Sequence, residues 1–348
     1  MTEYAQVGRL MYIRKSMVKT FEKCPLRFKL EYVDKEPKPP GFVESQAIQF
    51  GTEFHEHAYR FFDDVNMKKM REMKTVDEMG DYFKSLLPPG PEYEWFAEFE
   101  ARRYFSYQDK YLWMPYLREE TLTAHDLGLT GTVDRVDILE PGTYTTFEGH
   151  VITLHKPTPV IIDYKTGTWS YNNPSEMRFE LAFYAILLKH SSARIVTNIG
   201  GGIFPTVQKA YLYKLSPATF KAAERKVEKL KIALSKNEFE RKPSALCDWC
   251  PYLEKCFGGD IDGCIETLRR EQEEDQRPHE RVPAREESDT ALSMLWSRRI
   301  CGTDSLAPLH LQTRQSPALE TKNEEGLLAR IKACCLHLRE MWRGGGFV

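Results

Sequence analysis

No stretch of the 348 residues is long and apolar enough to span a lipid bilayer. The first residues also lack a basic segment followed by an apolar core, the pattern of a secretory signal peptide. Charge of one sign is not in excess, because the net charge is only −2 and proteins that coat nucleic acid indiscriminately are strongly basic. These absences predict a cytoplasmic protein with no membrane contact that would bind nucleic acid only through a local surface.

Two catalytic motifs are missing as well. The chain contains no Gly-Lys dipeptide, so it has no Walker-type phosphate-binding loop, and any helicase that acts with it must be another protein. His55-Glu56-His57 lacks the second histidine of the His-Glu-x-x-His motif. These absences exclude a Walker-type ATPase and a metalloprotease of that kind.

The eight cysteines include one closely spaced group. In a reducing compartment a disulfide framework is not expected, and the spacing Cys247-x2-Cys250-x5-Cys256 is typical of thiolate metal ligands. Either Cys24 or Cys264 could supply a fourth thiolate, for an iron-sulfur cluster or a local zinc site. Three further cysteines have no such context and are expected to be free thiols: Cys301, Cys334 and Cys335.

Hydrophobic periodicity predicts helices, then strands, then helices again. The predicted helices cover residues 16–32, 50–65, 76–87, 92–110, 177–189 and 217–237. The predicted strands cover residues 116–123 and 129–139, which form a hairpin, and residues 160–163, 193–206 and 209–214. Residues 140–157 are expected to form a loop or a small extra hairpin. This order predicts an α/β (α+β) fold with a central mixed sheet flanked by helices.

We expect a single folded domain over residues 1–274. Charged residues and prolines predominate after it and leave little to bury, so residues 275–348 are expected to form a linker. An apolar stripe within residues 325–343 would suit a docking helix, but a poorly ordered tail is the favoured interpretation.

Polar residues that could bind a metal end the apolar run from Pro159 to Asp163. Because side chains alternate along a strand, Asp163 and Lys165 share one face. Asp134 ends the earlier segment Gly131-Thr-Val-Asp, and carboxylates are the oxygen ligands that Mg²⁺ and Mn²⁺ prefer. A cation held beside a lysine can position a water. Glu119 or Glu120, on the preceding strand, could lie near this metal or face solvent.

Basic residues crowd the first helix and the helix after residue 217, and either face could follow a phosphate backbone or simply be solvated. The residues on the first helix are Arg14, Lys15, Lys19, Lys23, Arg27 and Lys29, and those on the later helix are Lys221, Arg225, Lys226, Lys229 and Lys231.

Taken in order, these motifs resemble the RecB-like branch of the PD-(D/E)XK nuclease superfamily, especially its iron-sulfur members such as the CRISPR-adaptation nuclease and the AddB-type recombination nuclease. The resemblance covers about residues 16–256. The family motifs are Cys-Pro, Gly-x-x-x-His, Gly-x-x-Asp, Asp/Glu-x-Lys, Gln-x-x-x-Tyr and a closing three-cysteine motif. They match Cys24-Pro25, residues 51–55, 131–134, 163–165 and 180–184, and Cys247, Cys250 and Cys256.

The resemblance implies a restriction-endonuclease-like core and a role for each matched residue. The residues implied to hold Mg²⁺ or Mn²⁺ are His55, Asp134, Asp163 and the backbone carbonyl of Tyr164. Lys165 would orient the attacking water or stabilise developing charge, and Tyr184 would serve catalysis and DNA contact. Glu180 stands where the family usually has glutamine, which puts its expected contact with DNA in doubt.

The resemblance also favours Cys24 as the fourth cysteine ligand. The implied centre is a 4Fe-4S cluster that joins the N-terminal and C-terminal segments, with structural Zn²⁺ held by Cys264 as the alternative.

The implied activity is that of a metal-dependent DNA nuclease, an exonuclease or endonuclease acting on single-stranded or end-exposed DNA. It would serve repair, recombination, phage DNA metabolism or CRISPR adaptation, with a separate helicase, recombination or CRISPR protein as a possible partner. The alternative is a catalytically inactive DNA-binding or scaffolding module of the same fold.

Overall fold

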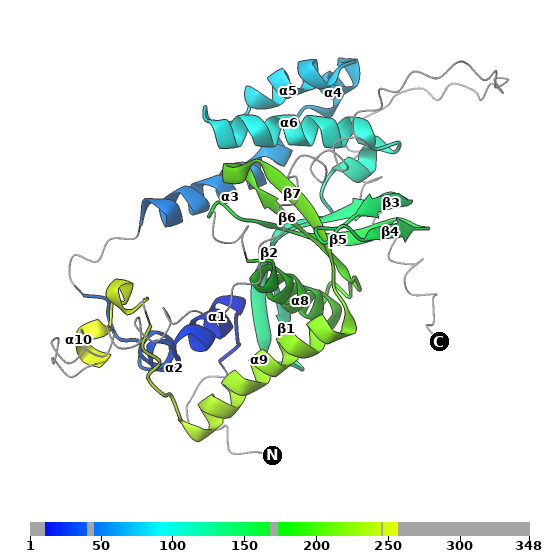
Figure 1. Cartoon of the computed structure of the whole chain (residues 1–348). Helices are drawn as coiled ribbons and strands as arrows, with labels where there is room; N and C mark the ends of the chain where they lie inside the picture. Colours follow the sequence, from blue (N-terminus) through cyan, green and yellow to red (C-terminus); the bar gives the residue numbers. More distant parts are fainter. Residues whose placement is uncertain (1–10, 40–44, 168–172, 245, 257–348) are drawn as a thin grey trace, which may run out of the picture.

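A five-stranded sheet with helices on both faces forms the centre of the molecule (Figure 1). The structure is a computed structural model and describes residues 11–39, 45–167, 173–244 and 246–256. This mixed architecture confirms the predicted fold class. The expected domain boundary at residue 274, the tail at 275–348, Cys264 and the three other isolated cysteines lie outside the described residues.

Helices begin and end close to the predicted positions in most cases. The α-helices are α1 Lys15–Lys23, α2 Pro25–Phe28, α3 Gln46–Asp64, α4 Met67–Glu72, α5 Val76–Lys84, α6 Pro91–Ser106, α8 Pro174–His190, α9 Pro217–Lys236 and α10 Leu253–Cys256. The shorter π and 3-10 segments are η2 Lys29–Val33, η3 Lys110–Trp113, η4 Pro205–Val207 and η5 Cys247–Trp249. None of the helices in the described ranges has the length and apolar character needed to cross a bilayer.

The central sheet has the strand order β1-β2-β5-β6-β7. Its strands are β1 Leu117–Ala124, β2 Leu129–Leu139, β5 Thr158–Tyr164, β6 Ile199–Phe204 and β7 Lys209–Lys214. Neighbours are antiparallel except β5 and β6, which are parallel and are connected through α8. A separate hairpin pairs β3 Gly142–Thr145 with β4 Val151–Leu154, so the hairpin interpretation of residues 140–157 is the correct one.

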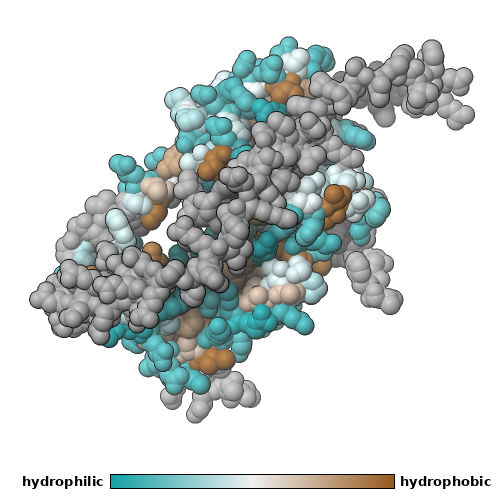
Figure 2. Space-filling view, viewed as in Figure 1, coloured by the Kyte–Doolittle hydropathy of each residue, from teal (hydrophilic) through white to brown (hydrophobic). Residues whose placement is uncertain are grey.

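Each face of the sheet is covered by its own hydrophobic core. Side chains alternate along β5, so Ile161 packs with α1, α8 and α9, whereas Val160 and Ile162 pack with α3, α5 and α6. Figure 1 shows the two helical layers above and below the sheet. On the face seen in Figure 2, apolar residues form small separate patches in a mostly hydrophilic surface, so the described apolar side chains gather mainly in these cores.

Close packing of α8 on the sheet depends on glycine in β6. A Cβ atom built at Gly200 would lie 2.7 Å from a methyl carbon of Leu181, a distance that no packed side chain tolerates. The glycine therefore lets α8 approach β6 directly. Because α8 also carries Glu180 and Tyr184, this contact helps to set their height above the sheet.

The first predicted helix is broken at Cys24, and the break has a local cause. A residue before proline is disfavoured in the helical region, and Cys24 has φ −156° and ψ 111°, with Pro25 starting α2. Two other predictions differ from the structure: α4 was not expected, and the strand predicted from residue 193 begins only at Ile199.

Candidate active site

A histidine and two carboxylates converge at one end of the sheet. His55 comes from α3, Glu119 from β1 and Asp134 from β2, and one ligand atom from each lies within 4.8 Å of the others. The Nδ1 atom of His55 is 3.5 Å from Oε1 of Glu119 and 3.7 Å from Oδ2 of Asp134. This mixed oxygen and nitrogen set suits a divalent cation.

Glu119 reaches this set through its place in the hairpin. The pairings on either side put it opposite Asp134, and its backbone has φ +43°, in the left-handed region that non-glycine residues rarely adopt. Of the two acids considered from the sequence, Glu119 is therefore the one near the site, whereas Glu120 is exposed.

The end of β5 is tied directly to Asp134. The backbone N–H of Tyr164 donates a hydrogen bond of 2.9 Å to Oδ2 of Asp134, which brings the neighbouring Asp163 to the same region. Burial, together with the nearby charge of Asp163, raises the pKa of Asp134 to about 6. Two carboxylates this close in a buried site favour a bound cation.

Two lysines flank Asp163. Lys165 forms an ion pair with its Oδ2 atom, as expected for two residues on one strand face, and Lys15 from α1 lies 3.0 Å from Oδ1. Burial opposes ionisation of Asp163, but the two ammonium groups outweigh it and lower the pKa of this carboxyl. Asp163 is therefore an anion at neutral pH.

Glu180 and Tyr184 face the same group from α8. Oε2 of Glu180 is 2.6 Å from Nζ of Lys15 and 3.1 Å from Nζ of Lys165. The Lys15 ammonium also lies 4.5 Å from the centre of the Tyr184 ring. Burial raises the pKa of Tyr184, so its hydroxyl is neutral and can donate a hydrogen bond but cannot act as a base near pH 7.

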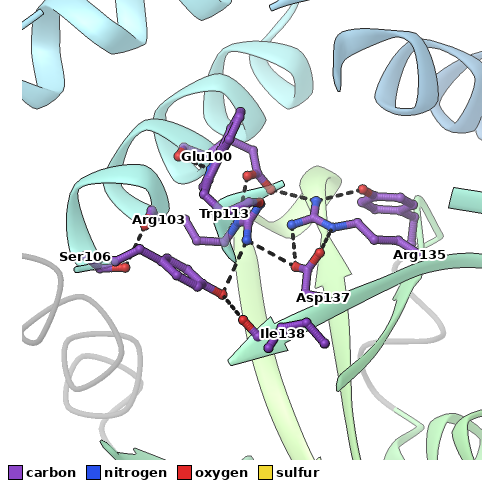
Figure 3. Close-up of polar contacts among 9 residues, drawn as sticks. Glu100, Arg103, Ser106, Trp113, Arg135, Asp137 and Ile138 are labelled. Carbon is purple, nitrogen blue, oxygen red and sulfur yellow. Dashed lines mark hydrogen bonds and ion pairs between the residues drawn. The ribbon is translucent and has the colours of Figure 1, made fainter. Parts of the chain in front are cut away.

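On the opposite face of the same strands, a buried ion-pair network fixes the residues next to the two acids (Figure 3). Arg135 follows Asp134 and donates to Glu100 at 2.7 Å, to both oxygens of Asp137, and to the Tyr164 hydroxyl at 3.0 Å. Tyr164 in turn follows Asp163. The network therefore links β2 and β5 directly behind the candidate site.

The four cysteines of the matched motifs line one small cavity, of about 40 Å³. It lies in the region where α2 and α10 come together (Figure 1). Cys24 contributes from the break between α1 and α2, and the other three are Cys247, Cys250 and Cys256. Burial, together with the proximity of Cys24, raises the pKa of Cys256 to about 11. The N-terminal and C-terminal segments thus meet at the thiols, as predicted.

A family model described as PD-(D/E)XK nuclease superfamily matches residues 15–257, well over half of the chain. The chain belongs to the PD-(D/E)XK nuclease superfamily. This confirms the superfamily to which the motifs pointed. No curated protein sequence matches the chain significantly. A crystal structure from Eubacterium rectale, described as a candidate exonuclease, is similar with a TM-score of 0.36 and 14% identity, covering 72% of this chain and 92% of that one.

The structure of this superfamily member brings the predicted residues together in two places. One place holds His55, Asp134, Asp163, Lys165, Glu180 and Tyr184, and the other holds the four cysteines. Tyr164 contributes its backbone N–H to the first place, and a role for its carbonyl stays a prediction. Sequence patterns did not single out Lys15, which lies one residue before the predicted helix but is the first residue of α1.

Proposed function

We propose that the chain is a Mg²⁺- or Mn²⁺-dependent deoxyribonuclease that hydrolyses phosphodiester bonds of single-stranded or end-exposed DNA. The observation that carries this proposal is the convergence of His55, Glu119 and Asp134 next to Asp163 and Lys165. Membership of a nuclease superfamily supports the reaction class, and the hard oxygen donors support the choice of metal.

The residues of the site would have different roles in hydrolysis. Asp134 and Asp163 would hold the cation, with His55 and Glu119 completing its protein ligands. When bound, such a cation polarises the phosphodiester and lowers the pKa of a coordinated water. Lys165, held by Asp163 and Glu180, is placed to orient the attacking water and to stabilise charge on the phosphate. The neutral Tyr184 hydroxyl can donate to a substrate oxygen.

We propose that Cys24, Cys247, Cys250 and Cys256 bind a 4Fe-4S cluster. Four thiols from opposite ends of the matched region line a single cavity, which suits the four thiolate ligands that such a cluster needs. Structural Zn²⁺ would use the same thiolate chemistry, and metal analysis distinguishes the two.

A nuclease assay on anaerobically purified full-length protein tests the proposal. Linear single-stranded, linear duplex and circular DNA are compared with Mn²⁺, Mg²⁺ and EDTA. We expect metal-dependent cleavage of linear DNA that EDTA abolishes. Metal-independent DNA binding without cleavage of any substrate would instead favour the inactive scaffolding module.

A further inference from the structure

Lys15 occupies a position in the active site that the matched family motifs do not include. Its ammonium group lies 3.0 Å from Oδ1 of Asp163, 2.6 Å from Oε2 of Glu180 and 4.5 Å from the centre of the Tyr184 ring. Its side chain is 17% exposed, so Lys15 is largely enclosed by the residues of the candidate site.

The negative charge of Glu180 balances the positive charge that Lys15 adds to the site. Asp163 and Glu180 are both buried, with side chains 1% exposed, and they pair with the two ammonium groups of Lys15 and Lys165. A glutamine at position 180 would leave both lysines to share the single charge of Asp163. Glu180 also pairs with Lys19. The glutamate therefore supplies a buried negative charge for the lysines that α1 brings to the site, which accounts for a carboxylate where an amide is usual.

We propose that Lys15 is a second catalytic lysine, which binds a non-bridging oxygen of the scissile phosphate, and that Glu180 is its positioning residue. The inference rests on the proposed nuclease function. An ammonium group has three N–H donors, and here Lys15 directs one at Asp163. Once Asp163 serves a cation, that donor is free for an anionic oxygen beside the same carboxylate. A fixed ammonium at this position stabilises the charge that grows on the phosphate during hydrolysis.

The contact between Lys15 and Asp163 also makes Lys15 a competitor of the metal. An ammonium 3.0 Å from a ligand oxygen opposes a cation at the same carboxylate, because like charges repel and both compete for its lone pairs. Removing Lys15 should therefore tighten metal binding while it slows cleavage, and a side chain with a merely structural role would not move these two quantities in opposite directions.

The test uses a Lys15→Met variant of the full chain, with circular dichroism as a check on folding. Calorimetric titration with Mn²⁺ in the absence of DNA should give about tenfold tighter binding, because a buried competing charge is gone. Single-turnover cleavage of linear DNA should fall roughly 100-fold, as when one donor to a developing anion is removed. A Lys15→Arg variant, which keeps the charge, should bind Mn²⁺ as the parental protein does.

Lys19→Met is the matched control for the Mn²⁺ titration. Lys19 lies one turn further along α1 and pairs with Glu176 and with the other oxygen of Glu180, at 2.5 and 2.6 Å. Lys19→Met removes the same charge from the same helix as Lys15→Met does, but this variant breaks no contact with Asp163. We therefore expect its Mn²⁺ affinity to change less than about twofold.

Glu180→Gln tests the positioning role. The substitution should impair cleavage more in the parental chain than in Lys15→Met, because in Lys15→Met only the contact of Glu180 with Lys165 is left to lose among its contacts to the two catalytic lysines. If Lys15→Met cleaved DNA at the parental rate, or bound Mn²⁺ more weakly than the parental protein, the inference about Lys15 would be wrong but the proposed nuclease function would stand. A parental protein that cleaves no DNA would overturn the proposed function.

Discussion

The candidate active site and the cysteine cavity lie toward opposite ends of α1 but are built differently. Lys15 opens the helix and Cys24 follows its last residue, so one short helix reaches both. The acids of the active site stand on adjacent strands and are buried, Asp163 completely and Asp134 to 9% exposure. The cysteines stand on or directly beside short helical segments and are only partly buried.

Different contacts hold the two regions together. Backbone pairing between β2 and β5, together with the Arg135 network, fixes the acids without any metal. The cysteine segments meet through scattered hydrogen bonds, including Leu26 N–H to the Glu240 carbonyl at 3.1 Å and Lys242 Nζ to the Glu22 carbonyl at 3.0 Å. We infer that metal removal affects chemistry at the first region and folding at the second.

Loss of a charged ligand should have the largest effect on chemistry. In an Asp134→Asn variant the amide oxygen can still accept the Tyr164 N–H, but the charge that holds the cation is gone. Cleavage should fall by at least roughly 10³-fold, while thermal unfolding and metal content at the cysteines stay at parental values. Cleavage within tenfold of the parental rate would remove Asp134 from the metal site.

Loss of a cysteine ligand should have the largest effect on stability. Cys24→Ser removes the proposed cluster ligand that would close a loop of more than two hundred residues, and we expect a loss of about 3–5 kcal/mol in the free energy of unfolding. Anaerobically purified parental protein should be brown with four irons per chain, and the variant colourless. Cys264→Ser is the control and should keep both colour and stability. Colourless parental protein with one zinc, lost in Cys264→Ser, would decide for the local zinc site.

The network behind the active site offers a test of stability on the sheet side. Arg135→Met leaves Glu100 and Asp137 in the core with Arg103 as their one remaining basic partner among the described residues, and breaking a buried pair in this way costs about 3–5 kcal/mol. Urea unfolding measures the change. Arg60→Met, which breaks an exposed pair with Glu56, is the control and should stay within about 0.5 kcal/mol of the parental protein. Equal stability of the two variants would show that the network does not hold β2 and β5.

Local patterns predicted what lies within one element, and tertiary contacts decided the rest. Alternation along β5 placed Asp163 and Lys165 on one face, and Pro25 accounts for the break that positions Cys24. Lys15 meets Asp163 across 148 positions in sequence, and no period in the first helix reveals that contact. The position of Glu119 in the site depends on a left-handed backbone conformation within a strand, which a glutamate in the sequence does not predict.

Acidification should weaken metal binding at the active site more gradually than mutation does. Asp134, whose pKa is raised to about 6, takes up a proton below that pH. The pKa of His55 is raised as well, because burial lowers it but the hydrogen bond with Glu119 and the charge of Asp134 outweigh burial. Protonation of His55 therefore acts in the same direction. Because a ligand must lose its proton to bind, Mn²⁺ affinity is full well above pH 6 and falls as pH drops through it, by about tenfold between pH 7.5 and 5.5. The Asp134→Asn variant should show a flatter dependence, and a parental affinity independent of pH would contradict the assignment.

Truncation after residue 274 should have the smallest effect of all. The family match ends at residue 257, and residues 275–323 are rich in charge and proline, with few apolar residues to offset the entropy cost of ordering. The shortened chain should therefore keep parental cleavage and parental iron content, each within about twofold. A chain ending at residue 244 is the matched control, since it also removes Cys247, Cys250 and Cys256 and should lose the cluster. If the chain ending at 274 lost iron or activity, residues 275–348 would have to support the nuclease domain. The sheet and the four cysteines would then not be enough to hold the two sites.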